Sequence, residues 1–213
     1  MSAPSVTHDS HGSGHGKSHA PAHPPLGSLG VDSRKLGVWT FIGSEALFFA
    51  ALITIYLVLA PVNMARSDAQ DPKEFLGIAF TTLLAAILLA SSLTMVLALA
   101  ANKRGDTKQF MIWHLATVVL GFCFLGGQVY EFNKLYHEGV TLSSSLFGTT
   151  FFVLTGFHGT HVAIGATWLL ATFLKVRKYP DSPENAMDVE LAGLYWHFVD
   201  LVWVVIFTVI YLI

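Results

Sequence analysis

The sequence predicts an all-α, polytopic membrane protein, a bundle of five transmembrane helices. Composition is the first observation: 53% of the 213 residues are hydrophobic and 12% are charged, whereas a typical soluble domain carries about 25% charged residues. The second observation is five apolar runs, each close to or above the roughly 20 residues that a helix needs to cross the hydrocarbon core. Irregular backbone cannot face lipid, so each run is predicted to be helical.

The predicted helices follow the order of the runs, at about 37–60, 76–101, 111–135, 146–174 and 190–213. The loops between them are short, which leaves no room for a soluble domain and makes consecutive helices antiparallel neighbours. The fourth run is long, so its helix is expected to tilt or to project from the bilayer. Three prolines are expected in loops, where a missing N–H costs nothing: Pro61, Pro72 and Pro180.

Residues 1–33 are a low-complexity segment rich in Ser, Gly, Pro and Ala. The segment has too few apolar residues to build a core, so a disordered, His-rich N-terminal tail is predicted before a transmembrane domain at 34–213. It also lacks the charged, apolar and small-residue order of a cleaved signal peptide. Its histidines could bind a transition metal loosely, although a solvated tail is the simpler interpretation; they are His8, His11, His15, His19 and His23.

The basic residues predict the orientation. Of the 12 Lys and Arg residues, nine lie in the tail or in the loops 102–110 and 175–189, and three lie on the opposite side. Cytoplasmic segments carry an excess of Lys and Arg, so the N-terminus is predicted to be cytoplasmic and the C-terminus periplasmic. The expected location is therefore a bacterial inner (plasma) membrane, crossed several times. The net charge of −2 indicates no nucleic-acid partner.

Polar side chains inside the predicted helices are the candidates for function. An ionisable group in hydrocarbon costs roughly 2.5–3.5 kcal/mol on insertion scales. A sequence that keeps several of them uses them either to pair helices or to do chemistry. The candidates are Glu45, Gln128, Glu131, His158, His161, Glu190, His197 and Asp200.

Helical spacing groups four of these candidates. Gln128 and Glu131 are three residues apart and share a face, so Glu131 is expected to turn into the bundle and to be hydrogen-bonded there. His158 and His161 have the same spacing, and the glycines beside them let neighbouring helix backbones approach closely. Both pairs are therefore predicted to face other helices.

The last predicted helix carries three candidates. Glu190 and His197 are seven residues apart and nearly eclipsed, and Asp200 follows His197 by one turn. Counted from the cytoplasmic side, Glu45 and His197 both lie about 12 Å deep by helix rise. Because a lone buried charge is strongly disfavoured, Glu45 and His197 are predicted to hydrogen-bond, with His161 close by.

Three interpretations of these groups remain. The glutamates and histidines superficially resemble the ligands of di-iron bundles, but their depths differ and no helix holds a Glu-x-x-His pair. Buried polar pairs that fix helix register are the structural interpretation, each worth about 0.6 kcal/mol. The third is a proton-linked role, since apolar surroundings change how readily such groups take up a proton. No catalytic, cofactor-binding or metal-binding residue is assigned, and Cys123 is predicted to be a buried, small hydrophobic residue.

Four segments together resemble subunit III of the haem-copper respiratory oxidases, the family of cytochrome c and quinol oxidases. They lie on four of the five predicted helices, in the order in which the family has them. They are GVWTFIGSEALFF at 37–49, GGQVYEF at 126–132, TGFHGTHVAIG at 155–165 and ELAGLYWHFVDLVW at 190–203. Four motifs in order are far more specific than one short pattern.

The resemblance implies a non-catalytic core subunit of an oxidoreductase complex that reduces O₂ to water and pumps protons. The family's haems and copper reside in subunits I and II, so no redox cofactor is expected in this chain, whereas bound phospholipid is. The expected partners are subunit I above all, then subunit II, small subunits and membrane lipid. The expected role is to support proton uptake and turnover stability. Glu45 matches the family's helix-buried carboxylate near the lipid cleft, and His197 matches the histidine of its Trp-His-Phe-Val-Asp motif.

One departure from the family pattern concerns lipid. Longer members have seven helices, the first two of which form a separate arm of a V that holds lipid. This chain lacks that pair, as short bacterial members do, so another subunit could supply the missing wall.

Two other functions stay open, an independent membrane metalloenzyme and a proton-coupled transporter. The transporter is disfavoured by the absence of an internal repeat and of proline within a predicted span. The electron donor, whether cytochrome c, a membrane-bound cytochrome or a quinol, depends on the other subunits.

Overall fold

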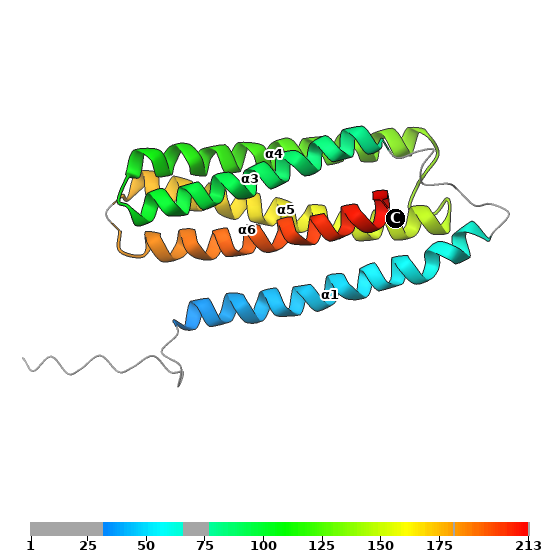
Figure 1. The fold of residues 1–213 in the computed structure, drawn as a ribbon, viewed down its shortest axis with the longest axis horizontal. Helices are drawn as coiled ribbons and strands as arrows, with labels where there is room; N and C mark the ends of the chain where they lie inside the picture. Colours follow the sequence, from blue (N-terminus) through cyan, green and yellow to red (C-terminus); the bar gives the residue numbers. More distant parts are fainter. Residues whose placement is uncertain (1–31, 66–76, 181, 213) are drawn as a thin grey trace, which may run out of the picture. The chain divides into compact units, whose positions relative to one another are not determined.

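The computed structural model describes residues 32–65, 77–180 and 182–212. Five of its helices are long and apolar enough to cross a membrane, which agrees with the predicted all-α fold. They are α1 (Ser33–Met64), α3 (Ile78–Lys103), α4 (Thr107–His137), α5 (Leu146–Lys178) and α6 (Asn185–Phe207), and a π-helical turn, η1 (Thr208–Leu212), continues α6 (Figure 1). The chain divides by its contacts into Met1–Ser33 and Arg34–Ile213. The predicted tail and its histidines lie outside the described residues.

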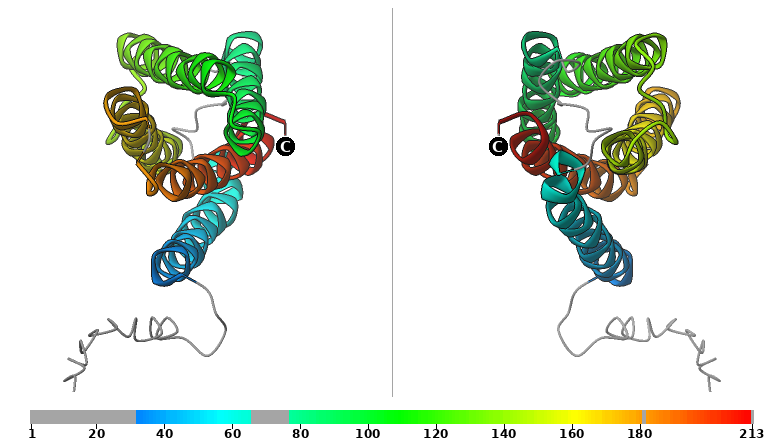
Figure 2. Two further views of the ribbon diagram at one scale, coloured as in Figure 1. Left: turned by 90° about the vertical axis from the view of Figure 1, so that its left-hand side faces the viewer. Right: turned by 90° about the vertical axis from the view of Figure 1, so that its right-hand side faces the viewer.

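Four helices of the second unit form a ring. α3 packs against α4 and α6, and α5 packs against the same two helices (Figure 2). The interior of the ring is filled with large apolar side chains, among them Leu88, Met95, Phe124, Trp196 and Trp203. This ring provides the rigid frame on which the polar groups are held.

α1 is a peripheral helix beside this ring. Aromatic side chains join it to its neighbours: Phe41 stacks on Tyr195 of α6 with ring centroids 6.2 Å apart, and Phe48 meets Phe157 of α5 edge to face at 5.1 Å. Only 11% of the residues in its most apolar stretch are buried, against 56% in the last span. Most of the surface of α1 therefore remains free for lipid or another chain.

Trp196 fixes the position of α6 within the ring. Its indole is fully buried and lies where a side chain at Gly121 of α4 or Gly165 of α5 would stand, because a Cβ at either glycine would come within 3.0 Å of the ring. The indole N–H donates to Ser91 Oγ of α3 over 3.0 Å. Three helices thus hold this residue, and the position of the adjacent His197 follows from it.

Side-chain caps begin two of the helices. Asp106 accepts a hydrogen bond from the backbone N–H of Gln109 at the start of α4, and Ser145 accepts one from Gly148 N–H at the start of α5. Such caps satisfy backbone donors that have no partner within the helix. They therefore define where the chain re-enters a helix after each short connection.

α1, α4 and α5 are longer than the apolar runs that predicted them, whereas α3 has the predicted length and is shifted by two residues. α1 begins at Ser33 and α6 at Asn185, because helical hydrogen bonding continues through the polar interface whereas an apolar run marks only the hydrocarbon. Glu45 and His197 each lie twelve positions after these first residues (45 − 33 and 197 − 185). At 1.5 Å per residue that is about 18 Å along the axis, and the two depths remain similar.

Pro61 lies inside α1, so its predicted place in a loop was wrong. The helix continues for one more turn, in which the Ala65 N–H donates to the Pro61 carbonyl over 3.1 Å. Transmembrane helices tolerate proline where the freed backbone group finds another partner. Pro180 lies in the turn after α5 as predicted, and Pro72 lies outside the described residues. The lack of proline within spans therefore no longer counts against a transporter.

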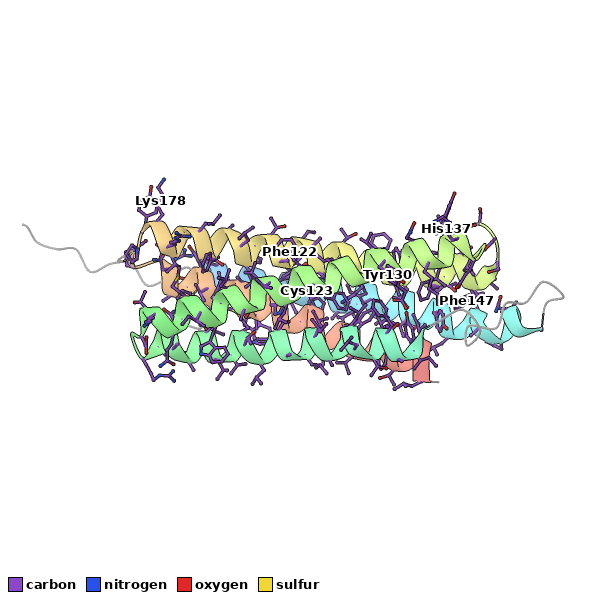
Figure 3. The ribbon with its side chains drawn as sticks, turned by 90° about the horizontal axis from the view of Figure 1, so that it is seen from above. Phe122, Cys123, Tyr130, His137, Phe147 and Lys178 are labelled. Carbon is purple, nitrogen blue, oxygen red and sulfur yellow. The ribbon has the colours of Figure 1, made fainter. Side chains whose placement is uncertain are left out.

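Cys123 is exposed, which corrects its predicted burial. It follows Phe122 on α4, and both side chains lie on the outer surface of the ring (Figure 3). The prediction failed because an apolar neighbourhood in a membrane protein is equally consistent with the lipid face and with the core.

Candidate functional site

Glu45 and His161 form a polar pair between α1 and α5. Glu45 Oε2 lies 3.1 Å from His161 Nε2, and both side chains are largely but not fully buried, with exposed fractions of 21% and 13%. Phe49, one turn after Glu45, meets the imidazole edge to face at 4.9 Å. The Tyr195 hydroxyl of α6 donates to the His161 backbone carbonyl over 3.3 Å. Three helices thus position this pair.

The hydrogen bonds of His161 determine how many protons the pair holds. His161 Nδ1 lies 2.7 Å from the Phe157 carbonyl oxygen, which can only accept, so Nδ1 carries a proton. A hydrogen bond between Nε2 and Glu45 then requires one further proton, which belongs either to the imidazolium or to the carboxylic acid. The pair therefore holds one proton that can reside on either side chain.

The predicted hydrogen bond between Glu45 and His197 was wrong: among the described residues, Glu45 pairs with His161 and His197 pairs with Ser92 of α3. His197 Nδ1 lies 2.6 Å from Ser92 Oγ. The two depths are similar, but α6 turns this histidine toward α3, because Trp196 beside it is bound to Ser91. Equal depth does not decide which face of a helix a residue occupies.

Asp200 belongs to the same cluster as His197. Its side chain is buried, and at i+3 it shares with His197 the face of α6 that meets Ser92 of α3. Its Oδ1 atom has no hydrogen-bond partner in the described part of the chain. Ser92 thus connects the histidine and the carboxylate, which the sequence placed one turn apart on α6.

Glu131 forms a second polar cluster at the other end of the ring, and it turns into the bundle as expected, with 5% of its surface exposed. Its Oε1 atom accepts hydrogen bonds from the Thr81 hydroxyl of α3 and, over 3.2 Å, from the Tyr211 hydroxyl. Tyr211 lies in η1, so the π-helical turn at the end of the chain supplies one of the two donors. This cluster joins the beginning of α3 to the ends of α4 and α6.

Gln128 and His158 lie in the centre of the ring. Gln128 Nε2 donates to the Thr155 carbonyl of α5 over 2.7 Å. His158 is fully buried and stacks on Trp203 with ring centroids 4.9 Å apart; within the described residues, neither of its ring nitrogens has a hydrogen-bond partner. His158 and His161 therefore differ in role, since His158 packs inside the ring whereas His161 reaches α1.

Glu190 lies near the beginning of α6 and is 44% exposed. Its Oε1 atom lies 2.7 Å from Lys35 Nζ of α1. A nearby ion pair, Lys175 with Asp188, joins the end of α5 to the beginning of α6. Glu190 is thus part of the charged end of the bundle and is separate from the interior clusters.

Sequence reasoning missed three hydroxyl groups that complete these clusters: Thr81, Ser92 and Tyr211. For Ser92 a signal was present, because the otherwise apolar second run contains Ser91, Ser92 and Thr94 within four positions. A hydroxyl can bond to its own helix backbone, so a single Ser or Thr in an apolar run does not indicate a partner on another helix. Such a group of hydroxyls within one turn indicates a polar contact with a neighbouring helix.

The metal-centre interpretation required several of the candidates to meet. In the described part of the chain, no three or more His, Cys, Asp or Glu side chains lie close enough to hold one ion. The candidates instead occupy separate places on the charged end, the α1–α5 contact, the α3–α6 contact and the opposite end of the ring. Each place joins helices, and at all four a titratable group lies beside a hydroxyl or beside another titratable group.

The family model described as cytochrome c oxidase subunit III matches residues 27–213. The chain belongs to the cytochrome c oxidase subunit III family. Membership confirms the resemblance inferred from the four motifs. It makes the chain a subunit of an oxidase complex, with other oxidase subunits as its partners.

Relatives within the subunit III family support this assignment. The chain is 41% identical to the cytochrome c oxidase subunit 3 of Bacillus sp. (strain PS3), over 84% of this chain and 86% of the relative. It is 39% identical to that of Alkalihalophilus pseudofirmus, over 89% and 91%. It is also 37% identical to the quinol oxidase subunit 3 of Bacillus subtilis, over 83% and 85%. Subunit III relatives thus occur in oxidases named for both electron donors.

Proposed function

We propose that the chain is the non-catalytic subunit III of a proton-pumping terminal oxidase that reduces O₂ to water. The match to the subunit III family over residues 27–213 carries this proposal. In this role the chain packs on subunit I, and it contributes no haem or copper to the complex. Its contribution is to proton uptake and to the lifetime of the working enzyme.

The Glu45–His161 pair supports the part of this proposal that concerns protons. It holds one proton that can reside on either partner, and it lies where α1 meets α5, with both side chains partly accessible. A buried structural pair without access could not exchange that proton. The geometry therefore suits a group that takes up and releases protons at the surface of the ring.

The exposed surface of α1 supports phospholipid binding. Leu47 and Val58 are 75% and 63% exposed, and aromatic side chains rather than close backbone contact join the helix to the ring. Such a surface suits acyl chains. In the oxidase, another subunit would supply the second wall of the lipid cleft.

The distribution of basic residues supports a cytoplasmic N-terminus. Lys35, Lys103 and Lys175 lie near the start of α1 and near the ends of α3 and α5, which belong to one end of an antiparallel bundle. By the positive-inside rule this end faces the cytoplasm. The chain is then a multi-pass protein of a bacterial inner membrane with a periplasmic C-terminus.

Purification of the native complex through an affinity tag on this chain tests the proposal. We expect haem bands in the visible spectrum to co-purify with the chain in a constant ratio, because subunits I and II come with it. A chain that purifies from native membranes without haem, or that catalyses a reaction alone, would contradict membership of an oxidase. Repeating the purification with an untagged strain is the control for adventitious haem protein.

A further inference from the structure

We propose that His197, Ser92 and Asp200 form a proton relay that connects a pocket at the predicted cytoplasmic end of the bundle with a carboxylate inside it. The inference rests on the proposed function for the use of the proton, because it names the groups through which subunit III would collect protons. It concerns the contact between α3 and α6 and is separate from the Glu45–His161 pair.

The pocket lies beside the first turns of α1 and α6. It has a volume of about 360 Å³, and its lining includes Trp39 of α1, Leu99 of α3, the Lys35–Glu190 ion pair and the His197 ring. His197 is seven residues beyond Glu190, or roughly 10 Å deeper along α6. The charged pair therefore lies nearer the aqueous side and attracts water, and the imidazole lies at the inner end.

His197 has the two contacts that a relay needs. The residue lines the pocket, while its Nδ1 atom is 2.6 Å from Ser92 Oγ. An imidazole can take up a proton on one nitrogen and release another from the second. Transfer begins when water in the pocket protonates Nε2. In one concerted step, the Nδ1 proton then passes to Ser92 Oγ while the Ser92 hydroxyl proton passes to the Asp200 carboxylate.

The balance of this transfer is one proton and no electrons. His197 ends neutral and Ser92 ends as a hydroxyl, so each can act again once its ring or hydroxyl reorients. The reverse sequence returns the proton to the pocket. No oxidant, reductant or further reactant takes part.

Asp200 is the inner end of the relay because it is buried and incompletely paired. It is 7% exposed, it shares with His197 the face of α6 that meets Ser92, and its Oδ1 atom has no hydrogen-bond partner among the described residues. An unpaired buried acceptor is costly, and a proton on the carboxyl group removes the charge. The charged groups at the pocket, Lys35 of α1 and Glu190 of α6, offset each other as an ion pair.

The register of the two helices holds the relay in place. Ser91 and Ser92 are consecutive on α3, and they bind the consecutive residues Trp196 and His197 of α6. The Ser91–Trp196 contact is fully buried and leads to no titratable group. Because the Ser91–Trp196 bond helps to place His197, the control is Thr82 on the same helix, whose exposed hydroxyl bonds to the Ile78 carbonyl of its own helix.

Infrared spectroscopy of the intact oxidase complex after a rapid pH jump tests the relay. The carboxylic-acid C=O band that disappears in Asp200→Asn belongs to Asp200. We expect its response to the pH jump to slow by about tenfold or more in His197→Gln and in Ser92→Ala, as loss of a proton-transfer group predicts. The final amplitude should be kept, and Thr82→Ala should respond at the wild-type rate.

Unchanged band kinetics in both variants would overturn the relay, as would an Asp200 band that does not respond to pH. The wild-type complex gives a second test that needs no relay variant. On transfer to D₂O, the relay predicts a rapid isotope shift of the Asp200 band, and a band that keeps its frequency would contradict it. These readouts report the site itself, whereas failure of the complex to contain haem would refute the proposed function.

Discussion

Glu45 and His161 share a single proton across the contact between α1 and α5. The Phe157 carbonyl occupies the other nitrogen of the imidazole, so the bond of 3.1 Å between Nε2 and Oε2 requires that proton. The pair can exist as imidazolium and carboxylate or as two neutral groups, and movement of the proton over a short distance interconverts them. A peripheral helix thus meets the ring at a polar pair held by hydrogen bonds.

Glu45→Gln should leave initial O₂ reduction near the wild-type rate while lowering the proton-to-electron ratio or shortening the active lifetime. The amide can still donate to His161 Nε2, so the local contact persists, but it cannot exchange a proton. Oxygen electrode traces and proton release by reconstituted vesicles measure the three quantities. Glu138→Gln, at an exposed ion pair with Lys134, is the control. Wild-type pumping and lifetime in Glu45→Gln would refute the role of the pair.

Glu131→Ala should reduce the thermal stability of the complex. The substitution leaves the buried hydroxyls of Thr81 and Tyr211 without their shared acceptor, which costs about 1–3 kcal/mol. Thermal unfolding of the purified complex, followed by loss of assembly, measures the effect. Glu138→Ala should change little, because exposed ion pairs contribute about 0–1 kcal/mol. Equal melting curves for wild type and Glu131→Ala would show that this cluster does not stabilise the bundle.

Gly121→Ala should destabilise the ring, and Gly126→Ala on the same helix should not. A Cβ at Gly121 would lie 2.6 Å from the Trp196 ring, whereas a Cβ at Gly126 meets nothing within 4 Å. Overpacking of a filled core typically costs about 1–3 kcal/mol. The yield of assembled complex and its melting temperature distinguish the two variants. Comparable losses in both would mean that Trp196 can move aside.

Deletion of residues 2–33 should leave insertion and assembly intact. The orienting residues Arg34 and Lys35 remain, and Lys35 retains its ion pair with Glu190. Membrane fractionation and co-purification of haem with the truncated chain provide the measurement. A truncated chain that inserts but fails to join the complex would assign a docking role to the tail.

The fold was largely predictable because five long apolar runs admit only helices in a bilayer. The inward position of Glu131 was predictable too, since Gln128 and Glu131 share one face. Pro61 and Cys123 show what the pattern of apolar runs does not predict. An apolar run does not reveal whether a helix continues past a proline or which side of it faces lipid.

The candidate site was predictable in its titratable groups but not in its pairing. Depth along a helix placed Glu45 level with His197, yet the rotation of α6, set by Trp196 between two glycines, turned His197 to Ser92 instead. The hydroxyls that complete the clusters give little indication of a polar contact in an apolar sequence, because Ser and Thr insert into helices at little cost. Packing between helices, rather than spacing within one, decides these partners.

The central claim, that this chain supports proton uptake and turnover stability without doing redox chemistry, is tested by the O₂ consumption of the complex with and without it. The account predicts that removing the chain leaves initial activity, because no redox ligand is lost. Activity should then decline faster with successive turnovers, and the slowing of proton uptake should increase as pH rises and protons become scarce. Restoring the chain should reverse both effects. Complete loss of initial activity on removal, with haem content unchanged, would contradict the accessory role and favour a catalytic one.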